Sequence, residues 1–245
     1  MHAVAEILLP PGTKDIKAAI DQVMNFFCNA TEDDDGKETI GECDWWDYWQ
    51  IGGRWSGNKT KATIPQERLD EFCAELNRRG VTVSGFTAGK QELNPPSQIP
   101  EVDALWREWF PGAGEQCQIF AHSGNRGDII DGNICTVADV PDNLTAERLI
   151  LAGPHWDAAS HPNDLEATDM IVTEYWNRCR HQKTDWDGNV AEGIRRFVAK
   201  GTEEAECYKA RKTERGEEID EEWVARKERK IPGPNWLVVT VDYHN

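Results

Sequence analysis

Apolar residues open the chain as a nearly unbroken run and then change to a helical spacing. Residues 2–10, HAVAEILLP, have the composition of a buried strand that ends at a Pro-Pro-Gly break. In residues 15–27 the apolar side chains, from Ile16 to Phe27, fall on one helical face. A strand followed by an amphipathic helix predicts a layer in which the helix packs on a sheet.

The chain closes with a second apolar run, WLVVTVDYHN, over residues 236–245. This run predicts a strand, and a strand with so few polar positions is expected inside a sheet, where both of its faces are covered. We therefore place it in the centre of the sheet, beside the first strand.

Two helices are predicted between these terminal strands. Over residues 63–80, Thr63 and Gln66 have the spacing of a capping box, the apolar positions form one face, and Gly80 is a stop signal. Residues 101–110 predict a short helix that gathers two tryptophans and a leucine on one side.

Strands and loops are predicted for the rest of the middle region. Short strands are expected at residues 81–86, 117–122, 127–130 and 133–140, with a hairpin signal at Asp131-Gly132. Residues 31–41 predict an exposed loop. Residues 144–152 fit either a helix or a strand. Residues 166–181 are predicted as a helix, although residues 171–173 also suit a strand.

A charged segment follows a predicted helix over residues 190–200. Residues 201–231 alternate acids with bases, and we interpret them as a charged helical excursion broken near Gly216. This excursion is either a partner-binding arm or solvated surface. The whole pattern predicts one α+β domain over residues 1–245, with a mixed or antiparallel sheet, helices packed largely on one face, and the excursion outside the core.

Charge and cysteine content narrow the classes of function. A net charge of −17 argues against direct nucleic-acid binding and against binding to an anionic membrane. The surplus carboxylates either keep the protein soluble or imitate a phosphate backbone toward a basic partner protein. Seven cysteines without a CxxC pair form neither a zinc ribbon nor a disulfide framework, and no segment has the length needed to cross a bilayer. We therefore expect a reduced, cytoplasmic protein.

The most concentrated chemistry lies in residues 44–57, DWWDYWQIGGRWSG. The Gly-Gly step allows a positive φ or a close approach to something flat or anionic, and the following arginine suits a phosphate or a carboxylate. Candidate ligand-binding residues are Trp46, Tyr48, Trp49, Gly52, Gly53, Arg54 and Trp55. The alternative is an aromatic core that crosses between strands, with Arg54 paired to Asp44 or Asp47. In a strand, Tyr48 and Trp49 would point to opposite faces.

A second candidate site lies on the last strand. Asp242 and His244 are two residues apart, so both point to the same face of the sheet. This pair is a candidate divalent-metal site, or a catalytic pair in which the acid orients an imidazole base. His2 would join them if the first and last strands are neighbours. The alternative is that the pair merely marks where the chain emerges into solvent.

These two stretches carry a resemblance to a known group of proteins. Residues 47–57 match the pattern D-x-[YW]-x-I-G-G-R-W-x-G, and residues 241–244 match V-D-x-H. Together they make the chain similar to a group of uncharacterised phage and prophage-type proteins. A third patch of that group, a Gly-Trp-rich loop after a strand, is represented only loosely by residues 153–157. The resemblance implies a phage origin and a location in the host cytoplasm, and it implies no activity.

Three functions follow from these features as hypotheses. The first is a binding protein, with counter-defence as one use, whose aromatic stretch recognises a nucleotide-like or other phosphate-bearing planar ligand. The second is a metal-dependent hydrolase or phosphodiesterase, in which Asp242 and His244 bind the metal ion and Arg54 stabilises developing charge. The third is an acidic inhibitor that mimics nucleic acid and blocks a host protein.

Overall fold

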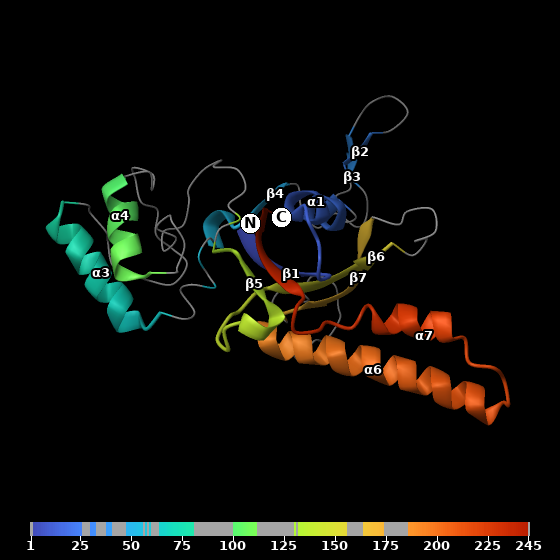
Figure 1. Ribbon diagram of the computed structural model, residues 1–245. Coiled ribbons are helices and arrows are strands. Elements are labelled where there is room, and N and C mark those ends of the chain that lie inside the picture. The colour runs from blue at the N-terminus through green and yellow to red at the C-terminus, as the bar shows by residue number, and fades with distance from the viewer. Residues whose placement is uncertain are drawn as a thin grey trace.

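A mixed six-stranded sheet forms the centre of the molecule (Figure 1). The computed structural model describes residues 2–25, 30–32, 38–40, 48–55, 57, 59, 64–80, 100–111, 130, 132–155, 164–173 and 186–244. The strands are β1 (His2–Leu9), β4 (Tyr48–Ile51), β5 (Ile134–Thr136), β6 (Arg148–Pro154), β7 (Leu165–Val172) and β8 (Leu237–His244). Their order is β4-β8-β1-β6-β7, and β5 also pairs with β8. The predicted α+β class and mixed sheet are confirmed.

The first and last strands are neighbours, as the two apolar runs predict. β1 and β8 pair antiparallel along their whole length, from His2 opposite His244 to Leu9 opposite Leu237. On its other side β1 pairs in parallel with β6. β8 lies inside the sheet, because β1 pairs with one edge and both β4 and β5 pair with the other.

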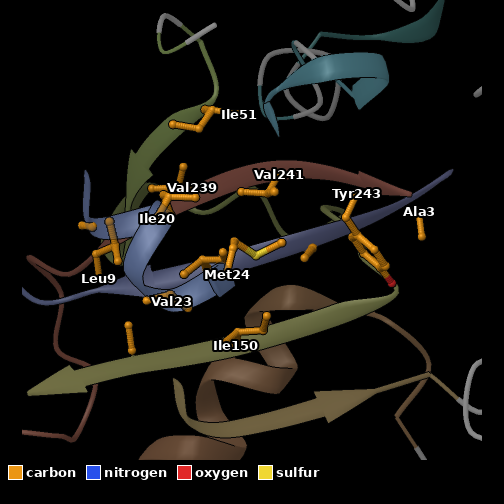
Figure 2. Close-up of a cluster of buried hydrophobic side chains, with 14 residues drawn as sticks. Ala3, Leu9, Ile20, Val23, Met24, Ile51, Ile150, Val239, Val241 and Tyr243 are labelled. Atoms are coloured by element: carbon orange, nitrogen blue, oxygen red, sulfur yellow. The ribbon is translucent and has the colours of Figure 1, made fainter. Parts of the chain in front are cut away.

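Helices cover both faces of this sheet. On one face, α1 (Ile16–Asn25) packs on alternate residues of β1, β6 and β8, and Figure 2 shows Ile20, Val23 and Met24 directed at the strands. On the opposite face, the first turns of α6 (Val190–Glu214) pack on the intervening residues. The expectation of helices largely on one face therefore differs from the structure. The physical reason is that the central strands are apolar at both alternating sets of positions.

Two further helices form a core of their own. α3 (Gln66–Arg78) and α4 (Pro100–Trp109) bury a cluster that shares no residue with the two clusters of the sheet. Phe72 meets Trp106 edge-on, with ring centroids 5.6 Å apart. Both helices are confirmed, but the capping box is not: Gln66 is the first helical residue, so Pro65 occupies the N-cap. The single domain over residues 1–245 remains a prediction.

The charged region is a helical hairpin. α6 continues from the sheet through the first part of the predicted excursion, as far as Glu214, and α7 (Glu221–Glu228) folds back on it (Figure 1). Tyr208 and Trp223 stack with ring centroids 3.9 Å apart, and Lys209 and Lys227 form ion pairs between the helices. The break at Gly216 is confirmed by its φ of 63°. Among the described helices, none is both long and apolar enough to cross a membrane.

Three local predictions require correction or resolution. Residues 165–172 form strand β7 rather than the start of the helix predicted over residues 166–181, because its β-branched residues pair antiparallel with β6. Residues 174–181 of that prediction lie outside the described residues. The ambiguous segment 144–152 leads into strand β6. Part of the predicted loop 31–41 is paired, since β2 (Ala30–Glu32) and β3 (Glu38–Ile40) form a two-stranded sheet. The strands predicted at 81–86 and 117–122, and most of the one at 127–130, lie outside the described residues.

Candidate functional site

The two stretches singled out in the sequence are neighbouring strands. β4 pairs antiparallel with the end of β8, which places Tyr48 opposite His244 and Gln50 opposite Asp242. Since β1 lies on the other side of β8, His2 is also opposite His244. Directly paired residues lie on the same face of a sheet. Tyr48, His244 and His2 therefore form one row across three strands, and Asp242 and Gln50 lie on the same face, which we call the Asp242 face.

Trp49 lies on the opposite face of the sheet from Asp242. It packs against the cluster that α1 covers, and the ammonium of Lys17 is 5.1 Å from the centre of its ring. Trp55 instead packs against the cluster on the Asp242 face. One planar ligand therefore cannot stack on both Trp49 and Trp55. Trp46 lies outside the described residues.

The Gly-Gly step turns the chain onto the Asp242 face. Gly52 and Gly53 have φ values of 79° and 50°, and they lead into η1 (Gly53–Trp55), a short 3-10 turn that contains Arg54. A Cβ atom added to Gly53 would lie 2.4 Å from Oδ2 of Asp242. The anionic group that approaches the Gly-Gly step is thus a carboxylate of the protein itself. The amide of Gly52 is also engaged, because it donates to the carbonyl of Thr240 at 2.9 Å.

A buried polar network lies next to Asp242 on the same face. Nζ of Lys59 lies 2.7 Å from Oε2 of Glu6 and also donates to the hydroxyl of Thr240. That hydroxyl donates to Oε1 of Glu6 at 2.7 Å. All three residues are at most 5% exposed. Lys59 follows η1 in the chain, so this network ties the segment after the Gly-Gly step to β1 and β8.

A second anchor holds the same segment. The backbone amide of Gly57 donates to Oδ1 of Asn133 at 3.0 Å. Asn133 is fully buried, and its carbonyl accepts from the amide of Thr240 at 2.9 Å. Gly52, Gly57 and Lys59 are therefore each attached to the sheet or to Asn133 beside it, and these attachments hold the backbone of η1 in place.

Sequence reasoning missed this network of Glu6, Thr240 and Lys59. Glu6 and Thr240 are polar residues inside otherwise apolar strands, and that interruption was the available signal. The two strands pair with Glu6 opposite Thr240. Lys59 carried no comparable signal, because it lies 53 residues from one partner and 181 from the other.

The opposite face carries a cation and a phenol at the same end of the sheet. Arg148 of β6 lies with its guanidinium carbon 5.0 Å from the ring centre of Tyr243 of β8. The two side chains meet across β1, where their register partners are the small residues Ala5 and Ala3. Burial raises the pKa of the Tyr243 phenol. This pair is buried, so it supports the core rather than an open site.

Asp242 is not positioned as an open metal ligand. Its side chain is fully buried and lies against Gly53. Among the side chains that the structure describes, no three His, Cys, Asp or Glu residues are grouped so that they could hold a metal ion. The pairing of Asp242 with His244 in a metal or catalytic site remains a prediction.

Comparison of the chain with protein-family models, with curated proteins and with solved structures found no match.

Proposed function

We propose that the chain is a binding protein that holds a nucleotide-like or other phosphate-bearing planar ligand at the end of β4, β8 and β1, on the Asp242 face. The observation that carries this proposal is the register of the three strands, which aligns Tyr48, His244 and His2 in one row. The turn η1 lies on the same face, since Gly53 touches Asp242 and Trp55 packs on the cluster there.

The residue types in this row suit such a ligand. Imidazole and phenol groups can donate hydrogen bonds to phosphate oxygens, and their rings can stack on a base. A net charge of −17 repels a phosphate from the protein as a whole, so binding requires a local cation. Arg54 supplies this cation, because its guanidinium can bind two phosphate oxygens together.

The buried residues around the row have a positioning role in this proposal. Asp242 and Gln50 pack closely against Gly53, while Glu6 and Thr240 bind the ammonium of Lys59. In this proposal the contacts hold η1 in place before the ligand binds, which reduces the entropic cost of binding. Given the resemblance to phage proteins, sequestration of a nucleotide signal of host defence is the use we propose for such a site.

Calorimetric titration with nucleoside triphosphates and cyclic dinucleotides tests the proposal. We expect one ligand per chain and no product after incubation, with Arg54→Ala weakening binding at least about tenfold, the value of one charge-assisted hydrogen bond. The matched control is Lys17→Ala, which removes an exposed cation beside Trp49 on the opposite face.

Two results would overturn the proposal. One is the absence of binding across this set of compounds. The other is an equal loss of affinity in Arg54→Ala and Lys17→Ala, because that would indicate general attraction to positive charge. Conversion of the nucleotide to a product would favour the hydrolase hypothesis instead.

A further inference from the structure

We infer that an apolar groove beside α6 binds a free single-chain carboxylate of the fatty-acid type, with the alkyl chain in the groove and the head group on Arg195. The groove lies between the first turns of α6, the 3-10 turn η2 (Val137–Asp139) and the Pro-Gly-Pro step that leads into β8. Figure 1 shows η2, in yellow-green, beside the start of α6. The groove shares no residue with the ligand site proposed above.

The groove is apolar and has the size of a small-molecule site. Its volume is about 420 Å³, within the range of about 300–1,000 Å³ that ligand pockets occupy. Eight of its nine lining residues are alanine, glycine, isoleucine, proline or valine, and the ninth is Arg195. Ile194 and Pro232 are buried, whereas Ala199 and Pro234 are exposed. The groove therefore runs from the surface of the core to solvent, and an alkyl chain in it would be removed from water.

Backbone groups on the walls of the groove are engaged in hydrogen bonds. The amide of Val137 donates to the carbonyl of Trp236 at 2.8 Å. The amide of Ala138 donates to the carbonyl of Pro234 at 3.1 Å, and the carbonyl of Gly233 accepts from the amide of Trp236 at 3.0 Å. A peptide in the groove would bury amides and carbonyls beside these occupied groups, at a cost in free energy, whereas an alkyl chain needs no hydrogen bonds. The walls thus favour an alkyl chain over a peptide.

Arg195 provides charge complementarity for an anionic head group. Its guanidinium lies 3.0 Å from Oε2 of Glu192, and Nε of Arg196 lies 3.3 Å from the other oxygen of that carboxylate. Two guanidinium groups therefore share one carboxylate, which leaves one positive charge in excess. Because Arg196 remains on Glu192 and exposed ion pairs are weak, Arg195 can turn to a ligand at small cost. The acid of η2, Asp139, does not line the groove, and its carboxylate accepts from the hydroxyl of Thr136.

Calorimetric titration of the full-length chain with decanoate, below the concentration at which it forms micelles, tests this inference. We expect one decanoate per chain. Octanoate, which is two methylenes shorter, should bind at least about tenfold more weakly, because each buried methylene tightens binding about fourfold. Decyltrimethylammonium has the same alkyl chain and a positive head group, and it should bind more weakly than decanoate although the net charge of −17 attracts it. Vesicles of anionic phospholipid should not bind the chain, because the same net charge repels them.

Two pairs of variants locate the ligand. Arg195→Gln should weaken decanoate binding about tenfold, the value of one charge-assisted hydrogen bond. Its matched control is Arg196→Gln, which removes the other guanidinium on Glu192 but does not line the groove. Ala199→Phe should abolish binding, because the ring fills the groove from its exposed side, and Ala210→Phe is the control at an exposed position of the same helix. Melting temperatures without ligand show whether each variant is folded, and the two arginine variants are sufficient if Ala199→Phe is not.

Five results would overturn the inference. Absence of decanoate binding is the first, and equal affinity for decanoate and octanoate is the second, because it would place the alkyl chain outside the groove. The third is an equal loss of affinity in Arg195→Gln and Arg196→Gln, and the fourth is unchanged binding in a folded Ala199→Phe variant. The fifth is binding to anionic vesicles together with equal affinity for decanoate and decyltrimethylammonium, which would indicate a membrane surface instead of a free carboxylate.

Discussion

Replacing Lys59 by methionine tests whether the buried ion pair holds the segment after η1 against the sheet. Nζ of Lys59 lies 2.7 Å from Oε2 of Glu6, and the two side chains are 6% and 0% exposed. Removal of one partner leaves an uncompensated charge in the core, which costs about 3–5 kcal/mol in buried pairs. Because a domain is stable by about 5–15 kcal/mol, we expect Lys59→Met to lose a large part of the free energy of unfolding.

The double variant Glu6→Gln with Lys59→Met separates charge from packing. A neutral glutamine can still accept the hydrogen bond of Thr240, and no charge remains buried. The double variant should therefore be less destabilised than Lys59→Met alone, by roughly 1–3 kcal/mol, as expected for residues in one network. Urea unfolding at pH 7, followed by circular dichroism and tryptophan fluorescence, measures the free energies of the unmodified chain, of Glu6→Gln, of Lys59→Met and of the double variant.

An exposed ion pair supplies the control for this cycle. Nζ of Lys200 lies 2.6 Å from Oδ2 of Asp169, with side chains 58% and 24% exposed. Surface pairs contribute about 0–1 kcal/mol, so Lys200→Met should have little effect. The reasoning would be refuted if Lys59→Met were no worse than Lys200→Met, or if the double variant were as damaged as the two single losses added together.

Two further predictions concern close packing and buried thiols. Gly53→Ala should lower the free energy of unfolding by about 3 kcal/mol or more, because the new side chain meets both a left-handed φ and a clash with Asp242. Gly12→Ala is the control: its φ is 85° and nothing lies within 4 Å of the new Cβ, so it should cost about 1 kcal/mol. Equal losses of the two variants in urea unfolding would contradict the close packing at Gly53. Burial raises the pKa of the Cys135 thiol to about 11. The folded thiol thus holds its proton more tightly than the unfolded one, so its contribution to stability is complete below about pH 8.5 and is lost as the pH rises toward 11. In Cys135→Ala the melting temperature should therefore fall less steeply between about pH 8.5 and 11 than in the unmodified chain, and an unchanged slope would contradict the raised pKa of Cys135. In the native protein at about pH 8, Cys135 should also react with a maleimide more slowly than the exposed Cys207.

Local periodicity predicted the elements whose own residues decide their structure. β1, α1, α3 and β8 were all predictable, because each has either a continuous apolar run or one apolar helical face. β7 was predicted as a helix, because its spacing fits both periods and only its pairing with β6 selects the strand. The pairing of β2 with β3 was missed for a different reason, because strands of three residues are too short to show a periodic pattern.

The candidate site was predictable only in part. Strand alternation predicts that Tyr48 and Trp49 lie on opposite faces, and the register puts Tyr48 in the row with His244. Alternation cannot predict the face of Trp55, because the Gly-Gly step redirects the chain between the two tryptophans. The contacts of Lys59 depend on the three-dimensional fold alone, so no local pattern contains them.

The contact between Gly53 and Asp242 limits which groups of the proposed site are free to hold a phosphate. A Gly-Gly step commonly brings backbone amides to an anion, and the sequence indicates such a role for Gly52 and Gly53. Here the carboxylate of Asp242 occupies that side of Gly53, and the amide of Gly52 donates to Thr240. In the proposed site the phosphate must therefore be held by side chains, above all by Arg54. This explains why Arg54→Ala is the variant that separates a ligand site from a structural turn: loss of binding with an unchanged free energy of unfolding identifies the former, and loss of stability alone identifies the latter.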